Sequence, residues 1–200
     1  MKPFLLIVVV FMKPVYLGST QMEVEKMLTE YERSNSWETA QKEILRLEGG
    51  FQNDPDDRGN WTGGVVGVGE NNGTNWGISA ATYPNEDIKN MTKERALQLY
   101  KRDFWTPLKC DLMPAEIALL AFDFAVNSGL GTAKKFVKEA SGYTGASYDL
   151  MTAEDFKFVD VFKLLALRYE YYLRISHTSK YKKYRKGWLA RLSNLVDKVD

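Results

Sequence analysis

Residues 45–60 read LRLEGGFQNDPDDRGN, a segment with helical apolar spacing that ends at a carboxylic acid. Gly49 and Gly50 stop the predicted helix directly after Glu48, and an acidic turn containing Asp57 follows. The helix macrodipole disfavours a negative charge at a helix C-terminus, and an apolar helix face disfavours it through desolvation. Both effects favour the protonated carboxyl group that a general acid needs. Glu48 is therefore a candidate general acid; the alternative is an exposed glutamate beside a glycine cap.

Asp57 lies nine residues after Glu48, in a turn rich in Asp and Pro. A carboxylate in a solvated turn keeps its charge, so the two groups can hold opposite protonation states. Such a pair is typical of glycosidic bond cleavage. The alternatives for the turn are a plain solvated loop or a calcium site. The calcium alternative lacks the EF-hand pattern of alternating Asp or Asn, a Gly and a final Glu.

Apolar periodicity and capping residues predict a mainly α protein with one small β-hairpin. The segment 61–79 carries six glycines and alternating valines, which indicates a short, irregular hairpin. The segment 113–129 is apolar on nearly all sides, which predicts the central buried helix. The predicted helices cover residues 34–50, 91–105, 113–129, 152–176 and 180–196. Their start signals are Ser36, Thr92, Pro114 and a capping-box pattern at Thr152 and Asp155.

The composition limits the chemistry that is available. The chain has 200 residues, of which 44% are hydrophobic, enough for one core or for two small lobes that share one. Cys110 is the single cysteine and His177 the single histidine, which excludes a disulfide within the chain and zinc motifs with two histidines. Catalysis would then depend on carboxylates, hydroxyls and amides, and we expect no cofactor and no metal.

Charge is distributed unevenly along the chain. The net charge is +1, yet residues 171–196 contain seven basic residues and no acidic ones. This stretch is either a solvated helix face or a surface that meets an anionic polymer. Because the basic stretch is confined to the C-terminal tail and no nucleic-acid-binding fold signature accompanies it, we expect no nucleic-acid partner.

The N-terminal segment, residues 1–22, is interpreted as an export signal or an N-terminal extension. The apolar run 4–12 is too short to span a bilayer, which needs about 20 residues, so no stable membrane insertion is expected. Lys13 interrupts the run, and Met22 and Met27 are alternative starts. An export signal would place the protein in the periplasm or cell envelope; otherwise it would stay in the cytoplasm until released.

Several motifs occur in a fixed order and together resemble one enzyme family. They are LEGGFQNDPDDRG (47–59), GTNWGIS (73–79), YP (83–84), DIKNMTKERALQLYKRDFW (87–105) and FDFAVNSG (122–129). In this order they resemble the glycoside hydrolase family 108 muramidases, which include phage endolysins and proteins labelled secretion activators. The resemblance covers residues 37–129. More weakly, KGWLARLSNL (186–195) resembles the C-terminal peptidoglycan-binding-3 region that accompanies this family.

The resemblance implies a lysozyme-like helical fold with a β-hairpin beside an active-site cleft, and it implies N-acetylmuramidase activity. Glu48 matches the glutamate expected to be the general acid, Asp57 the aspartate and Thr74 the threonine. Where many members pass almost directly from the acidic turn to the threonine, this chain inserts NWTGGVVGVGENN. Because of the insertion, Thr62 is a second candidate for the threonine of the family. We prefer Thr74, because it begins the matching motif TNWGI.

The resemblance also suggests a glycan groove. Asn75 and Trp76 follow Thr74, and Asp123 and Asn127 lie near a helix end, so amides and an indole could contact sugar. Core packing of Trp76 and structural hydrogen bonding of the other polar residues are the alternatives.

The implied partner is the glycan strand of peptidoglycan, and a monomer is favoured. We expect a catalytic region over residues 23–129 and a helical region over 130–200 that packs on the first and has peptidoglycan binding as its candidate role. A lytic transglycosylase and a non-catalytic peptidoglycan-binding module are the alternative functions.

Overall fold

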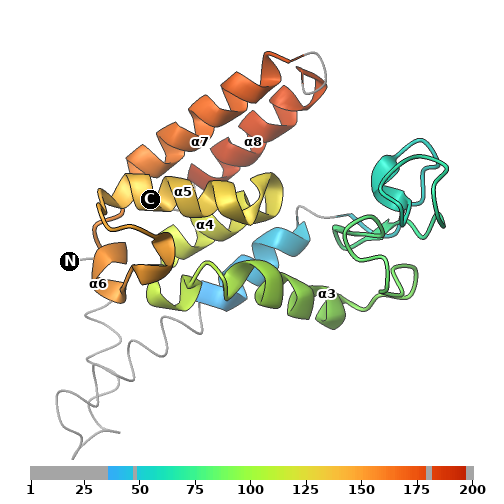
Figure 1. Cartoon of the computed structure of the whole chain (residues 1–200), viewed down its shortest axis with the longest axis horizontal. Helices are drawn as coiled ribbons and strands as arrows, with labels where there is room; N and C mark the ends of the chain where they lie inside the picture. The colour runs from blue at the N-terminus through green and yellow to red at the C-terminus, as the bar shows by residue number, and fades with distance from the viewer. Residues whose placement is uncertain (1–35, 47–48, 179–181, 197–200) are drawn as a thin grey trace, which may run out of the picture.

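The structure, a computed structural model, describes residues 36–46, 49–178 and 182–196 (Figure 1). The α-helices cover residues 36–46 and the segments α3 (Lys93–Tyr100), α4 (Ala115–Ser128), α5 (Leu130–Ser141), α6 (Ala153–Phe156), α7 (Val161–Ser176) and α8 (Arg185–Val196). Two short strands, β1 (Thr74–Asn75) and β2 (Ile78–Ser79), form an antiparallel pair. The prediction of a mainly α, lysozyme-like fold with a small hairpin is confirmed. The predicted N-terminal segment 1–22 lies outside the described residues.

Helix α4 is the central helix of the core, as its sequence predicts. Pro114 precedes its first turn, Gly129 ends it, and residues 117–125 are all buried. Helices α3 and η2 (a π-helical turn, Lys101–Trp105) cover it on one side, and α5 and α7 on the other (Figure 1). A helix buried on every side needs apolar residues on every side, which is what this sequence supplies.

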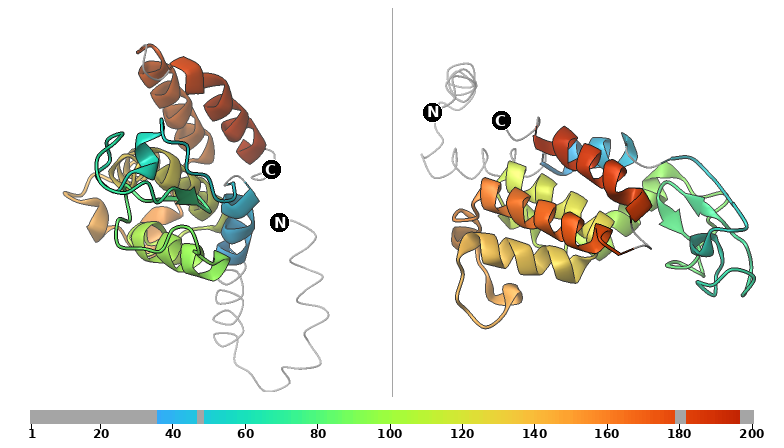
Figure 2. Two further views of the ribbon diagram at one scale, coloured as in Figure 1. Left: turned by 90° about the vertical axis from the view of Figure 1, so that its right-hand side faces the viewer. Right: turned by 90° about the horizontal axis from the view of Figure 1, so that it is seen from above.

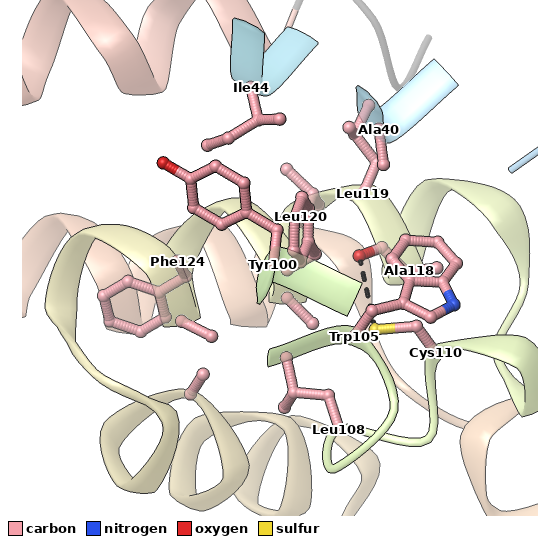
Figure 3. Packing of buried hydrophobic residues seen from close by; sticks show 14 of the residues in the cluster. Ala40, Ile44, Tyr100, Trp105, Leu108, Cys110, Ala118, Leu119, Leu120 and Phe124 are labelled. Carbon is pink, nitrogen blue, oxygen red and sulfur yellow. Dashed lines mark hydrogen bonds between the residues drawn. The ribbon is translucent and has the colours of Figure 1, made fainter. Parts of the chain in front are cut away.

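Aromatic side chains join the helix over residues 36–46 to this core. Trp105 is fully buried and packs its ring against Trp37 at 4.9 Å and against Phe122 at 5.5 Å between centroids. Figure 3 shows Ala40 and Ile44 of the same helix directed at the side chains of α4. This packing fixes the position of the helix over residues 36–46 against the core.

The predicted helix over residues 152–176 is two helices, which corrects the expectation. The capping box at Thr152 and Asp155 is confirmed, but α6 ends at Phe156. Phe156 is fully buried against Tyr148, and Asp160 starts α7 by accepting a hydrogen bond from the Lys163 N–H at 2.9 Å. A second capping residue therefore begins a new helix with its own direction.

The other helix boundaries differ less from the predictions. Thr92 caps α3 as predicted, and the regular helix changes to the π-helical turn η2 after Tyr100. The last helix begins at Arg185, after the 3-10 turn η5 (Lys182–Tyr184). Helix α5, which was not among the predicted helices, follows α4 directly after Gly129 and packs against it.

The hairpin is confirmed but narrower than the predicted segment 61–79. The strands pair Thr74 with Ser79, and the turn between them consists of Trp76 and Gly77, both with positive φ (51° and 75°). A hairpin turn whose two central residues both have positive φ is typically of type I′. Residues 49–82 form a lobe at one end of the molecule, coloured teal to green in Figure 1.

The C-terminal helices α7 and α8 pack side by side along the face of the helical part (Figure 2). Exposed residues of the basic stretch predicted from the sequence include Arg174 of α7, Lys186 of α8 and Lys182 of the turn η5 between them. Among the described residues, none of the helices combines the length and apolar character needed to cross a bilayer.

Candidate active site

Glu48, the predicted general acid, lies outside the described residues. The chain resumes at Gly49 and Gly50, which are both exposed and have nothing within 4 Å of a Cβ added at either position. Phe51 and Gln52 then lead into the lobe that contains the other predicted catalytic residues.

Asp57 lies in the acidic turn and is exposed. It caps the short 3-10 helix η1 (Arg58–Asn60), because its Oδ1 accepts a hydrogen bond from the Gly59 N–H at 2.9 Å. The backbone N–H of Asp57 in turn donates to the carbonyl of Asp54 at 3.2 Å. The carboxylate is thus held by its own turn and remains open to solvent.

Thr74 lies in β1 and is tied to the segment that follows Glu48. Its backbone exchanges two hydrogen bonds with Gln52, at 2.9 and 2.8 Å. Its hydroxyl donates to Oδ1 of Asn60 at 2.7 Å. Since Asn60 follows Asp57 by three residues and its N–H donates to the Asp57 carbonyl at 3.0 Å, the structure links Thr74 to the turn of Asp57.

Asn60 is the residue of this site that the sequence analysis missed. Its side chain is fully buried, and both ends of its amide form hydrogen bonds. Its Oδ1 accepts from Gln52 Nε2 and from the Thr74 hydroxyl. Its Nδ2 donates to Gln52 Oε1 and to the Asp54 carbonyl. The sequence offered one indication of this role, because the amide of Asn60 directly follows the turn that contains Asp57. Its partners lie 8 and 14 residues away, so local periodicity does not identify them.

Thr62, the rival to Thr74, lies at the base of the inserted loop. Its hydroxyl accepts a hydrogen bond from the Glu70 N–H at 2.9 Å, and its backbone N–H donates to the Glu70 carbonyl at 2.9 Å. A bridge between Trp61 and Asn71 closes this loop. The structure therefore brings Thr74, and not Thr62, into the hydrogen-bonded network with Asn60.

Asn75 and Trp76 are both anchored to the segment that precedes α3. The buried amide of Asn75 donates to the carbonyl of Ile88 at 3.1 Å. The indole N–H of Trp76 donates to the carbonyl of Met91 at 3.2 Å, and the hydroxyl of Tyr100 donates to the carbonyl of Trp76 at 3.0 Å. These contacts give Asn75 a structural task, while Trp76 is half-buried and keeps part of its ring accessible.

Asp123 and Asn127 face the C-terminal helices. The carboxylate of Asp123 is 4% exposed and forms ion pairs with Arg168 of α7 and with Arg191 of α8, the latter at 2.8 Å. Asn127 Oδ1 accepts a hydrogen bond from the hydroxyl of Tyr172 at 2.7 Å. Both residues therefore join α4 to α7 and α8, and the structure does not bring them together with Asp57 and Thr74 by any contact among the described residues.

Burial raises the pKa of Tyr172, and the nearby Arg168 guanidinium opposes this shift. The phenol is therefore neutral at physiological pH and can donate its proton to Asn127. The interface between α4 and α7 thus contains one ion-paired carboxylate and one neutral donor–acceptor pair.

Residues 41–129 match the family model of Glycosyl hydrolase 108. This match supports a glycoside hydrolase and, for these residues, the resemblance seen in the sequence. The match ends with α4, so a peptidoglycan-binding role of residues 130–200 stays a prediction.

A solved structure has a similar fold over most of the chain. SagA of Brucella abortus superposes with a TM-score of 0.64 at 22% sequence identity, covering 83% of this chain and 94% of that protein. At this identity the similarity concerns the fold. No curated protein matches the chain.

Outside the glycosyl hydrolase 108 region, two surface hollows border helix α5. One of about 430 Å³ lies between α5 and α7 and is lined by Lys135, Glu139, Glu170 and Arg174 among others. Another of about 320 Å³ lies at the end of α5 beside Tyr143. Neither hollow contains a predicted site residue. Within the described ranges, no three His, Cys, Asp or Glu side chains are grouped as metal ligands would be.

Proposed function

We propose that this protein is a peptidoglycan hydrolase, an N-acetylmuramidase that cleaves the β-1,4 bond between N-acetylmuramic acid and N-acetylglucosamine. The observation that carries the proposal is the match of residues 41–129 to Glycosyl hydrolase 108. The hydrogen-bonded lobe directly after Glu48 supports it, because this lobe links Thr74 to the turn of Asp57 through Asn60.

In the proposed reaction, Glu48 donates its proton to the glycosidic oxygen as the bond to that oxygen breaks. A water molecule forms the new bond to the anomeric carbon and gives its proton to Asp57. Thr74 holds this water by accepting its second O–H. General acid catalysis of this kind typically contributes about 10²- to 10⁴-fold to the rate. The exposed glycines after Glu48 leave room for a saccharide chain to approach.

The remaining predicted residues take two roles in this proposal. Trp76 offers the accessible part of its ring to a sugar, while Asn75, Asp123 and Asn127 have a structural role and hold neighbouring elements together through the bonds described above. The exposed lysines Lys182 and Lys186 would add electrostatic attraction to the anionic cell wall.

A muropeptide assay tests the proposed function. Purified protein is incubated with insoluble peptidoglycan, and the released fragments are analysed by mass spectrometry. Hydrolysis adds one water per cleaved bond and produces reducing N-acetylmuramic acid ends. Ends of the 1,6-anhydro type would instead identify a lytic transglycosylase, and binding without release would identify a non-catalytic peptidoglycan-binding module.

A further inference from the structure

The side-chain network around Asn60 has a defined hydrogen-bond direction. The carbonyl of Asp54 can only accept, and it lies 3.0 Å from one end of the Asn60 amide, so that end must be the NH₂ group. The N–H of Asp54 can only donate, and it lies 3.1 Å from Gln52 Oε1, which orients the second amide in the same way. The backbone N–H and C=O of one residue, Asp54, thus fix the orientation of both side-chain amides.

The direction of the network determines what the hydroxyl of Thr74 can do. Oδ1 of Asn60 accepts from Gln52 Nε2 at 3.0 Å and must be an acceptor toward Thr74 as well. A threonine hydroxyl has one proton and two lone pairs. Because its proton is directed at Asn60, Thr74 can offer any further partner only its lone pairs.

We propose that Asn60 is a positioning residue that holds Thr74 as an obligate hydrogen-bond acceptor for the attacking water. This inference rests on the proposed function. Water that donates one O–H to Thr74 and the other to Asp57 has its own lone pair free for the anomeric carbon. If the hydroxyl of Thr74 could rotate, it could donate to one of the two lone pairs of the water instead, and the water would no longer be held in a single orientation.

The burial of Asn60 makes the arrangement rigid. Its side chain is 0% exposed, so water does not compete for Oδ1, and its backbone carbonyl also accepts the Gly73 N–H at 3.1 Å next to β1. Replacing the side chain leaves this backbone contact in place. Substitution of Asn60 therefore removes the hydrogen bonds of its side-chain amide while its backbone contact with Gly73 is kept.

A double-mutant cycle on the intact chain tests the proposal. The variants are Asn60→Ala, Thr74→Val and their combination, and the measurements are kcat and KM for peptidoglycan cleavage together with Tm. We expect Asn60→Ala to lower kcat by about 10- to 100-fold, as misplacement of a reacting group does, with little change in KM. In the Thr74→Val background, Asn60→Ala should lower Tm but leave kcat unchanged, since the hydroxyl it orients is already gone.

A matched control uses the other threonine of the lobe. The Thr62 hydroxyl accepts from Glu70 and has no bond to Asn60, so Thr62→Val and Asn60→Ala should act additively on kcat. If Asn60→Ala does not fold, Asn60→Ser and Asn60→Leu serve in the same cycle; the first is smaller and keeps a polar group, and the second has the branched shape of Asn without its hydrogen bonds.

The possible results separate this inference from the proposed function. Additive effects of Asn60→Ala and Thr74→Val on kcat, or an unchanged kcat for Asn60→Ala, would overturn the role of Asn60 while leaving the hydrolase in place. Wild-type products with 1,6-anhydro ends would overturn the role of the water as well. A wild-type protein that releases no fragments would overturn the proposed function itself.

Discussion

Gly73 lies where β1 meets the segment that follows Glu48. Its φ is +82°, and a Cβ at this position would lie 2.5 Å from the carbonyl oxygen of Gln52 and 2.7 Å from the ring of Phe51. Any larger residue would push Gln52 away from Thr74 and so disturb the backbone pair that holds the candidate site.

Gly73→Ala should therefore lower both stability and activity. Gly67 is the matched control, because its φ is +79° and a Cβ there would meet nothing within 4 Å. Gly67→Ala should cost only the strain of a left-handed backbone, about 1–2 kcal/mol, and should leave kcat unchanged. Thermal unfolding and peptidoglycan cleavage measured on both variants check this. Equal losses for the two would show that segments 51–52 and 73–74 do not approach closely.

Residue-scale prediction from sequence succeeded where the signal was local. Thr92 and the Thr152–Asp155 pair are caps read from adjacent residues, and the structure confirms both. Trp76 in a left-handed turn could not be predicted, because bulky residues seldom adopt positive φ. Its conformation depends on bonds to Met91 and Tyr100, which are distant in sequence.

At the scale of elements, the start of α6 makes stability depend on pH. The pKa of Asp155 is lowered by the hydrogen bond from the Thr152 N–H and then by the bond from its hydroxyl. A carboxyl group whose pKa is lower in the folded state stabilises the protein fully above its unfolded pKa, which is about 3.9 for Asp. That contribution is lost as the pH falls through the folded pKa.

Comparison of wild type with Asp155→Asn tests this linkage. Asn can still accept the bond from Thr152 but carries no charge, so the Tm difference between the two proteins should be constant from about pH 5 to 7 and should shrink below about pH 4. Thermal unfolding followed by circular dichroism across this range measures it. A difference that stays constant to pH 2 would show that the charge of Asp155 does not stabilise the helix start.

The break between α6 and α7 shows why some element boundaries escape prediction. Apolar spacing over residues 152–176 is compatible with one helix, and only the burial of Phe156 against Tyr148 fixes where the first turn ends. Prediction of the candidate site is limited in the same way by contacts between residues that are distant in sequence. Its candidate catalytic residues were predicted from motifs, whereas Asn60 escaped prediction because its contacts are with Gln52 and Thr74, which are distant in sequence.

At the scale of the whole molecule, Asp123 connects the region that matches Glycosyl hydrolase 108 to the C-terminal helices. Its buried carboxylate is shared by Arg168 of α7 and Arg191 of α8, whose side chains are 2% and 14% exposed. Removing one partner of a buried ion pair leaves the other charge uncompensated, which typically costs about 3–5 kcal/mol.

Asp123→Ala should therefore destabilise the protein by about 3–5 kcal/mol, because two guanidinium groups would lose their counter-ion. Glu154→Ala is the control, since the Glu154–Lys157 ion pair is 74% and 61% exposed and should matter little. Urea denaturation of both variants measures the difference. Similar stability of the two variants would mean that Asp123 is free for another task, such as contact with substrate.

The most direct test of the account is the substitution Glu48→Gln, assayed by the release of soluble muropeptides from peptidoglycan. Gln keeps the volume of the side chain but cannot donate a proton to the leaving oxygen, so the rate should fall by about 10²- to 10⁴-fold or more. Tm should be unchanged or raised, and glycan binding should persist. Glu38→Gln, an exposed position on the helix over residues 36–46, should cleave like wild type. Release by Glu48→Gln at the wild-type rate would show that the acid is another residue and would contradict the account.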